Sequence, residues 1–298
     1  MDLLLRRRMM MTPPTKEYIQ FADPTVEGIC ITKFSSDGIG VTMQDAASVT
    51  NIGDAFKKNA SIVSFDELQY FVNLASIPAS AFENCYALSA ITLPNSITSI
   101  GNLAFVNCSV LAGIVLPTSV TSIGQSAFSG CPNLVVEDLN LPNLTYIAST
   151  SFKGTKVKKI TSLGSITSLP NQSVFENCYD ITSVVLPNTL TSIGTATFNR
   201  DSSIASVQMS NSITSIGNNA FWGCSSLTSM DLPATITSIG SIAFYGCSSL
   251  ATMYIRATTP PSIGSNAFQN TSPTFYVPSA SVSAYQAVLP SGSNIIGF

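Results

Sequence analysis

Histidine is absent from this 298-residue chain. Histidine is the commonest general base, catalytic-triad partner and transition-metal ligand, so its absence argues against an enzyme. Serine and threonine are abundant, but no G-x-S-x-G nucleophile motif accompanies them. We therefore predict a non-enzymatic protein with no catalytic residues, no bound metal and no other cofactor.

Charged residues and long apolar runs are also scarce. Only 10% of the residues are charged, against about a quarter in an average protein. The net charge of -3 offers no basic footprint for a nucleic-acid partner. No stretch approaches the roughly 18 apolar residues that span a bilayer, so we expect no membrane insertion. Serine, threonine and asparagine supply the polar surface instead.

A single block of residues recurs along the chain. It reads I-x-L-P, then I-T-S-I-G, two residues, A-F, two residues and Cys. The spacing of its phenylalanines is 23 or 24 residues throughout, and a further copy ends at Phe56. The regular phenylalanines are Phe82, Phe105, Phe128, Phe152, Phe175, Phe198, Phe221, Phe244 and Phe268. A fixed period of this length predicts a repeat solenoid, mainly β, of about ten coils.

Each repeat has a predictable local geometry. Leu88, Ile91 and Leu93 follow an L-x-x-I-x-L spacing, which places apolar side chains on one side of a strand that ends at Pro94. A second extended piece follows at residues 97–100. The glycine four residues before each phenylalanine is expected to adopt a positive φ at a sharp turn. The A-F-x-x-C segment is expected to form a turn or a 3₁₀ piece. One repeat cannot bury its own apolar side, so we predict a right-handed solenoid with a single buried phenylalanine column.

Cysteine is found at a repeat position, three residues after phenylalanine. The six cysteines there are Cys85, Cys108, Cys131, Cys178, Cys224 and Cys247, and Cys30 is the seventh. Metal-binding C-x-x-C pairs are missing. Other coils carry Asn59, Thr155, Asp201 or Thr271 at this position. We therefore predict a column of small, buried, unpaired thiols.

The repeat resembles the BspA-like class of leucine-rich repeats. The resemblance rests on LPNSITSIGNLAFVNC at residues 93–108 and SITSIGNNAFWGCSSL at residues 212–227, and it covers residues 49–268. Proteins of this class are commonly surface or secreted adhesion modules of bacteria and some protists. The resemblance implies binding to a protein or carbohydrate on a cell surface or matrix, and it implies no catalytic residues.

The two ends of the chain differ from the repeats. Residues 1–83 carry 17 of the 29 charges, which predicts an N-terminal cap at residues 1–48. Residues 18–51 resemble a degenerate dockerin-like EF-hand, whose loop at 34–45 offers only Asp37 and Asp45 as acids. That set is too small for a normal calcium site. Residues 274–285, TFYVPSASVSAY, resemble the closing segment of such repeats, so we predict a C-terminal cap at residues 269–298.

The first eleven residues read MDLLLRRRMMM. A signal peptide would need an apolar segment of about 7–15 residues after the positive charges, so none is predicted. The R-R-R-M-M-M opening is similar to those of proteins carried by phages and prophages of gut bacteria. The localisation is therefore left open between the cell surface, the extracellular space and a phage virion.

Candidate ligand-binding residues are those that depart from the repeat. Trp222 and Tyr245 both follow the repeat phenylalanine, so they should be neighbours on one exposed ridge. Gln208, Asp231 and Tyr254 fall in one outward column of the strands. We expect a ligand to contact residues 209–255 through Trp222, Tyr245, Asp231 and Tyr254.

A basic cluster marks the least regular coils of the array. Lys153, Lys156, Lys158 and Lys159 lie there, and they are interpreted as a solvated patch or as a second candidate surface. Three functions remain open: an adhesion or binding module, a phage virion or tail-associated binding protein, and a purely structural spacer.

Overall fold

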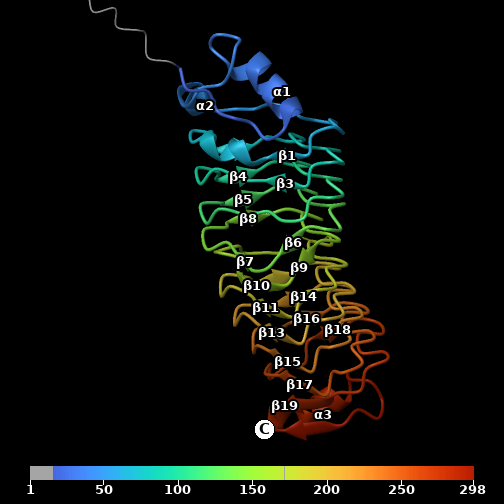
Figure 1. Ribbon diagram of the computed structural model, residues 1–298. Coiled ribbons are helices and arrows are strands. Elements are labelled where there is room, and N and C mark those ends of the chain that lie inside the picture. Colours follow the sequence, from blue (N-terminus) through green and yellow to red (C-terminus); the bar gives the residue numbers. More distant parts are fainter. Residues whose placement is uncertain (1–15, 171) are drawn as a thin grey trace, which may run out of the picture.

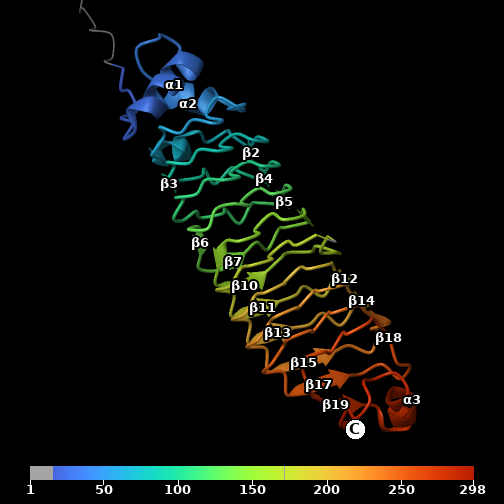
Figure 2. The same ribbon diagram turned by 90° about the vertical axis from the view of Figure 1, so that its right-hand side faces the viewer.

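The computed structural model describes residues 16–170 and 172–298 as an elongated stack of coils, with helices at its two ends. Figure 1 shows the chain winding from the N-terminal helices to the C-terminus, and Figure 2 shows the same stack from the side. Every pairing between its strands is parallel. The predicted β-solenoid is confirmed.

Most coils contribute a first strand to one side of the stack, which we call the first-strand face. Its members are β1 (Ser64–Phe65), β3 (Ala90–Ile91), β6 (Val135–Val136), β7 (Leu139–Asn140), β9 (Lys156–Val157), β10 (Lys159–Ser162), β11 (Ser183–Val185), β13 (Ser206–Gln208), β15 (Ser229–Leu232), β17 (Thr252–Ile255), β19 (Thr274–Val277) and β20 (Ile295–Gly297). Alternate residues point inward, as Met230 and Leu232 do in β15. Strand β3 lies within residues 88–93, where the L-x-x-I-x-L spacing predicts a strand, although it ends at Ile91 and not at Pro94.

The second extended piece of each coil forms a second-strand face. Its two-residue strands are β2 (Ser76–Ile77), β4 (Ser99–Ile100), β5 (Ser122–Ile123), β8 (Tyr146–Ile147), β12 (Ser192–Ile193), β14 (Ser215–Ile216), β16 (Ser238–Ile239) and β18 (Ser262–Ile263). The serines pair in register from coil to coil, for example Ser215 with Ser238. Threonine hydroxyls one position earlier donate to the preceding coil, as from Thr214 Oγ1 to the Thr191 carbonyl at 3.1 Å.

The A-F-x-x-C turns close each coil and carry the phenylalanine column. Neighbouring rings from Phe56 to Phe268 stack with centroids 5.2–5.7 Å apart. All of these rings are buried. Full burial of one such side chain contributes on the order of 2 kcal/mol. The predicted core column is therefore confirmed, and Phe56 extends it into the first coil.

The repeat glycines behave differently from the prediction. Their φ angles lie outside the left-handed region, so the expected positive φ is wrong. The left-handed residues lie two before and two after each phenylalanine, as Leu103 and Asn107 do around Phe105. Glycine is required by close packing: a Cβ on Gly217 would lie 2.7 Å from the carbonyl carbon of Gly194 in the preceding coil.

The cysteine column is confirmed as a set of free, buried thiols. Each repeat thiol donates to the carbonyl of the phenylalanine one coil earlier, as Cys85 Sγ does to Phe56 at 3.0 Å and Cys224 Sγ to Phe198 at 3.2 Å. Burial raises the pKa of Cys85 to about 11. The thiols therefore act as small core residues that also satisfy backbone carbonyls.

Backbone hydrogen bonds between coils follow two patterns. In the strands the donors run both ways, as in other parallel ladders: Gly101 N–H donates to the Ile77 carbonyl of the earlier coil at 2.8 Å, and Leu186 N–H donates to the Gln208 carbonyl of the later coil at 3.0 Å. In the turns the earlier coil donates to the later one, as from Phe82 N–H to the Ala104 carbonyl at 2.8 Å. The turns thus form a third ladder, although they contain no strand.

The N-terminal segment covers the first coil with α1 (Pro24–Phe34) and α2 (Met43–Ser48). Val26 and Cys30 of α1 are buried and continuous with the core of the array. Asp23 begins α1 by accepting from the amide of Thr25, and its other oxygen accepts from the amides of Val63 and Ser64. Burial disfavours the charged form of Asp23, but the hydrogen bonds from these amides stabilise that form more strongly. The pKa of Asp23 is therefore below its ordinary value. The 3₁₀ helix η1 (Asp66–Tyr70) follows β1.

The C-terminal segment closes the other end. Strand β19 continues the sheet of β17, and β20 returns to lie beside β19 after η2 (Ser279–Ser281) and α3 (Val282–Gln286). Tyr285 is buried and its hydroxyl donates to the Ala257 carbonyl at 2.8 Å. The exact domain boundaries at residues 48 and 268 stay predictions.

Candidate binding surfaces

Trp222 and Tyr245 lie side by side on the turns, as the sequence predicts. Their ring centroids are 6.3 Å apart and the rings are nearly perpendicular, at 86°. Both side chains are partly exposed. We call this pair the aromatic ridge.

The aromatic ridge already has partners within the chain. The guanidinium of Arg200 lies 5.0 Å from the Trp222 ring centroid, a cation–π contact. The amide of Asn270 donates to the Tyr245 hydroxyl at 2.7 Å. Neither contact was predicted from the sequence, although Arg200 lies in the preceding coil, one repeat position beyond that of Trp222. The ridge is therefore a ladder of side chains from Arg200 to Asn270.

Asp231 and Tyr254 lie in register on β15 and β17, with their side chains outward. Arg256 donates two hydrogen bonds of 2.7 Å to the carboxylate of Asp231. Tyr254 stacks on Tyr276 with centroids 4.7 Å apart, and Phe298 lies 5.9 Å from Tyr254. We call these five residues the strand-face cluster.

Arg256 joins the charged and aromatic parts of the strand-face cluster. Its guanidinium lies 5.7 Å from the Tyr254 ring and 5.8 Å from the Phe298 ring. The hydrogen bonds from Arg256 to Asp231 raise the pKa of the guanidinium. About half of each side chain is exposed, so the ion pair adds little stability. A shallow cavity of about 220 Å³ adjoins it and is lined by Val207, Gln208, Met209, Asn211, Asp231, Pro233 and Arg256.

The four predicted site residues therefore fall on two surfaces. The aromatic ridge lies on the turns, and Asp231 and Tyr254 lie on the first-strand face. Among residues 16–170 and 172–298, no hydrogen bond, ring contact or pocket joins the two pairs. Whether either surface binds a ligand stays a prediction.

The basic cluster is largely neutralised by neighbouring acids. Lys153 pairs with Glu176 at 2.8 Å, and Lys158 pairs with Glu137 at 2.7 Å. Lys159 pairs with Asp138 at 3.1 Å.

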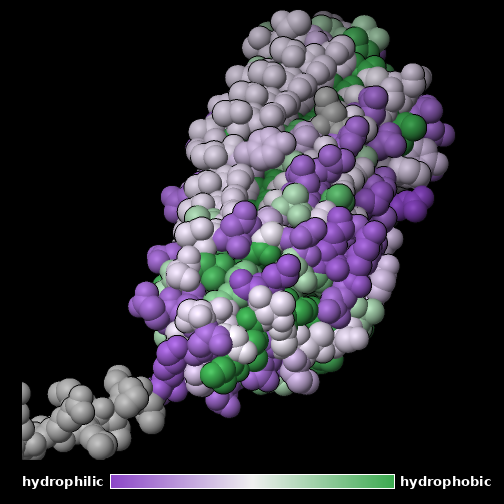
Figure 3. Space-filling view, turned by 90° about the horizontal axis from the view of Figure 1, so that it is seen from above, coloured by the Kyte–Doolittle hydropathy of each residue, from purple (hydrophilic) through white to green (hydrophobic). Residues whose placement is uncertain are grey.

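In the space-filling view, rows of side chains of nearly neutral hydropathy cover much of the visible surface, and strongly hydrophilic residues concentrate on one side (Figure 3).

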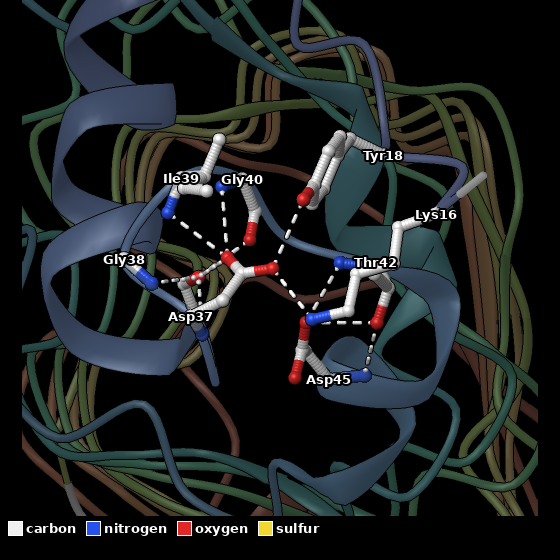
Figure 4. A network of polar contacts seen from close by, with 9 residues as sticks. Lys16, Tyr18, Asp37, Gly38, Ile39, Gly40, Thr42 and Asp45 are labelled. Atoms are coloured by element: carbon white, nitrogen blue, oxygen red, sulfur yellow. Dashed lines mark hydrogen bonds and ion pairs between the residues drawn. The ribbon is translucent and has the colours of Figure 1, made fainter. Parts of the chain in front are cut away.

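The loop between α1 and α2 is organised by Asp37 (Figure 4). Its carboxylate accepts from Lys16 Nζ at 2.6 Å, from the Tyr18 hydroxyl at 2.9 Å and from the Ile39 amide at 2.9 Å. The bond from Lys16, with those from the loop, holds the pKa of Asp37 well below its ordinary value. Asp45 is bound to Thr42 in the capping box of α2. The carboxylates of Asp37 and Asp45, which a calcium loop would use as ligands, thus accept hydrogen bonds from other groups of the protein. The dockerin-like resemblance stays a prediction.

The described residues offer neither a metal-binding cluster nor a membrane-spanning helix. Across the described residues, no three His, Cys, Asp or Glu side chains come together to hold a metal ion. In the same residues, no helix has the length and apolarity to cross a bilayer. The two predictions that concern residues 1–11, namely that they form no signal peptide and that their R-R-R-M-M-M opening is similar to phage-carried proteins, lie outside the described residues.

A parallel solenoid with this period and this apolar pattern is a leucine-rich-repeat protein. The family described as BspA type leucine rich repeat region matches residues 50–178 and 171–287 in six copies. The chain therefore belongs to this family, as its sequence resemblance indicated.

Solved structures of bacterial leucine-rich-repeat proteins are similar to the chain. One, from Bacteroides ovatus, is 22% identical, covers 84% of this chain and 88% of its own, and has a TM-score of 0.38. A leucine rich cell surface protein from Faecalibacterium prausnitzii is 21% identical, with coverages of 76% and 87% and a TM-score of 0.37. The leucine-rich-repeat protein of T. pallidum is 27% identical, with coverages of 59% and 72% and a TM-score of 0.41. No curated protein gives a significant match.

Proposed function

We propose that this protein is a non-enzymatic adhesion module that binds a protein ligand on the first-strand face, at residues 209–255. The family supports a binding module in general. The observation that carries the finer proposal is the strand-face cluster, where Asp231, Arg256 and Tyr254 present charge and aromatic area together. Arginine and aromatic residues dominate the energetics of protein interfaces.

A protein ligand fits the strand-face cluster better than a carbohydrate does. Sugars bind on open ring faces, but Tyr254 and Tyr276 stack on one another. Arg256 lies over Tyr254 and Phe298 as well. Its pairing with Asp231 fixes the orientation of both groups before a ligand arrives, which lowers the entropic cost of binding.

The test compares two double variants in a binding screen against arrays of host matrix proteins and glycans. The first variant combines Asp231→Asn with Tyr254→Ser, and the second combines Trp222→Ser with Tyr245→Ser. For a protein hit we expect the first variant to weaken binding by more than about 2 kcal/mol, the usual hot-spot threshold. Loss in the second variant as well would extend the contact to the aromatic ridge.

Circular dichroism of both variants checks that the fold is unchanged. Normal binding by both would place the site elsewhere and overturn the proposal. A glycan hit sensitive to these changes would replace the protein ligand with a carbohydrate. A chain that binds nothing in either array would fit the structural spacer. Cell fractionation and virion proteomics would separate a surface protein from a virion protein.

A further inference from the structure

The first-strand face is interrupted in its N-terminal half. At the other end, four residues of β15 pair with four of β17. In the coil at residues 111–117, only Gly113 pairs, through isolated bridges to Ala90 and Val135. Residues 114–116 belong to no strand. One coil of this face therefore lacks most of its ladder.

The interruption lies beside an unusual coil. The coil from Phe128 to Phe152 has 24 residues. The coil from Phe244 to Phe268 also has 24 residues and keeps its ladder through β17, so length alone does not interrupt the face. The coil from Phe128 to Phe152 differs in that it carries two strands, β6 and β7, on either side of Glu137 and Asp138. Both strands pair onward, β6 with β9 and β7 with β10. This coil thus follows its later neighbour and separates from the coil before it.

This separation leaves backbone groups without partners. The amides of Val115, Leu116, Glu137 and Asp138 donate to no acceptor among the described residues. The Val115 side chain is 84% exposed, although it lies in the middle of an apolar segment. An exposed backbone with unpaired amides and carbonyls can accept an added strand.

A groove of about 790 Å³ lies at this interruption. Its apolar lining includes Ile91, Leu93, Ile114, Leu116, Val136 and Leu139. The charged residues of its lining are all acidic: Asp66, Glu137 and Asp138. Lys158 and Lys159 bind Glu137 and Asp138 but are not part of the lining.

Two of these acids keep an oxygen free. Asp66 accepts from the Thr92 hydroxyl through Oδ1, and its Oδ2 has no protein partner among the described residues. Glu137 accepts from Lys158 through Oε1, and its Oε2 is likewise without a partner there. The groove therefore combines an apolar lining, open backbone and the carboxylate of Asp66, which has no cationic partner among the described residues, while Glu137 keeps one oxygen open beside Lys158.

We propose that this groove binds an extended segment of a partner protein in which apolar side chains alternate with lysine or arginine. The segment adds as a strand beside Val115 and Leu116. Its apolar side chains pack on Ile114 and Val136, and its basic side chains reach Asp66 and Glu137. A strand presents alternate side chains to opposite sides. One set of the ligand's side chains can therefore pack on the apolar lining while the other set reaches the acidic residues.

Other ligand classes fit the groove less well. Its carboxylates repel phosphate, which disfavours nucleic acid. Its lining contains no aromatic ring for a sugar to stack on. The site is separate from residues 209–255, so it does not depend on the ligand proposed there.

The test uses end-blocked heptapeptides with valine at odd positions and lysine, serine or glutamate at even positions. Binding to the full chain is measured by calorimetry at low and high salt. We expect the lysine peptide to bind at least 10-fold more tightly than the serine peptide, and the glutamate peptide not to bind. A lysine peptide N-methylated along one edge should lose at least 10-fold, because it cannot form the strand hydrogen bonds.

Variants locate the binding on the protein. Asp66→Asn combined with Glu137→Gln should weaken the lysine peptide at least 10-fold, and Val115→Lys should do the same. Asp180→Asn is the matched control, because Asp180 is exposed and does not line the groove. The Asp231→Asn and Tyr254→Ser variant should bind the peptide normally.

Several results would overturn the proposal: no binding of the lysine peptide at millimolar concentration, equal binding of the serine peptide, or full binding of the N-methylated peptide. Glycan-array binding that Val115→Lys abolishes would assign the groove to a carbohydrate instead. Each variant must have unchanged circular dichroism. The Asp66→Asn, Glu137→Gln variant and the Val115→Lys variant change the charge of the groove independently, so if one misfolds the other still tests the proposal.

Discussion

The Oδ1 atom of Asp201 accepts a hydrogen bond of 2.8 Å from the backbone N–H of Cys178, one coil earlier. Asp201 occupies the position that cysteine holds in neighbouring coils and is fully buried. Its Oδ2 has no partner among the described residues. Burial raises the pKa of this carboxyl well above its ordinary value, and the Cys178 amide offsets that only in part.

Stability should therefore depend on the ionisation of Asp201. The folded state binds its proton more tightly than the unfolded state, whose pKa is about 3.9. The contribution of Asp201 to the free energy of unfolding is then greatest below that pH and declines as pH rises toward the folded pKa. The titratable groups around it are Cys178, Cys224 and Glu176.

Two substitutions test this dependence. Asp201→Asn removes the charge, and Asp201→Cys restores the thiol column. We expect Asp201→Cys, which also removes the unpaired Oδ2, to stabilise the fold by about 1–3 kcal/mol at neutral pH, the usual cost of an unsatisfied buried polar group. Asp201→Asn, which removes the ionisation but keeps an unpaired polar atom, should stabilise it less. The gain over the parent should shrink between pH 7 and pH 4.5 in denaturant titrations. Exposed Asp180→Asn is the control, and a gain independent of pH would show that the folded state does not raise the pKa of Asp201.

Truncation of a stacked phenylalanine should be strongly destabilising. Phe221 is fully buried between the rings of Phe198 and Phe244. We expect Phe221→Ala to cost about 3–5 kcal/mol, as for other buried aromatic residues. Tyr179, whose exposure is 52%, is the control, and Tyr179→Ala should change the denaturation midpoint little. Equal effects of the two substitutions would mean that the column is not the core.

The repeat glycines should tolerate no side chain. In Gly217→Ala the new methyl group would lie 2.7 Å from the carbonyl carbon of Gly194, so the two coils must separate. We expect a loss of about 1–3 kcal/mol, typical of overpacking. Gly28→Ala in α1 is the control, because nothing lies within 4 Å of its Cβ, and alanine favours a helix by about 0.5–1 kcal/mol. A neutral Gly217→Ala would show that the coils are not held this closely.

Reducing agent should leave the melting temperature unchanged, because all seven cysteines are free and buried. Burial raises the pKa of Cys247 to about 12, so little thiolate is present at neutral pH. We expect an aromatic disulfide reagent to label no thiol in the native protein and all seven after denaturation. Peptide mapping that finds Cys224 linked to Cys247 would contradict this prediction.

The sequence predicts the coils well because each structural requirement recurs in every repeat. Phe82 and Cys85 mark the core, and Pro233 follows the last residue of β15. The role of glycine was misjudged, since Gly217 is constrained by its neighbour Gly194 and not by its own φ. Contact between coils is a property of the stack, and the residue pattern of one coil does not show it.

The candidate surfaces were only partly predictable. Trp222 and Tyr245 share one repeat position, so their adjacency follows from the period alone. Arg256 reaches Asp231 in the adjacent coil through a long side chain, and Phe298 arrives with the returning C-terminal strand. Neither contact follows from a fixed offset. The groove beside Val115 lies next to the coil that carries β6 and β7, and the repeat pattern does not show these two strands.

The single hydrogen-bond direction of the turns makes the two ends of the array chemically different. At the first coil the turns present carbonyl oxygens away from the array, and at the last coil they present N–H donors. Asp23 supplies an anion to the amides of Val63 and Ser64 in the first coil. The caps are thus specific to their ends, whereas whole repeats can be gained or lost between them, so the length of such an array can change without any change in the way it starts or stops.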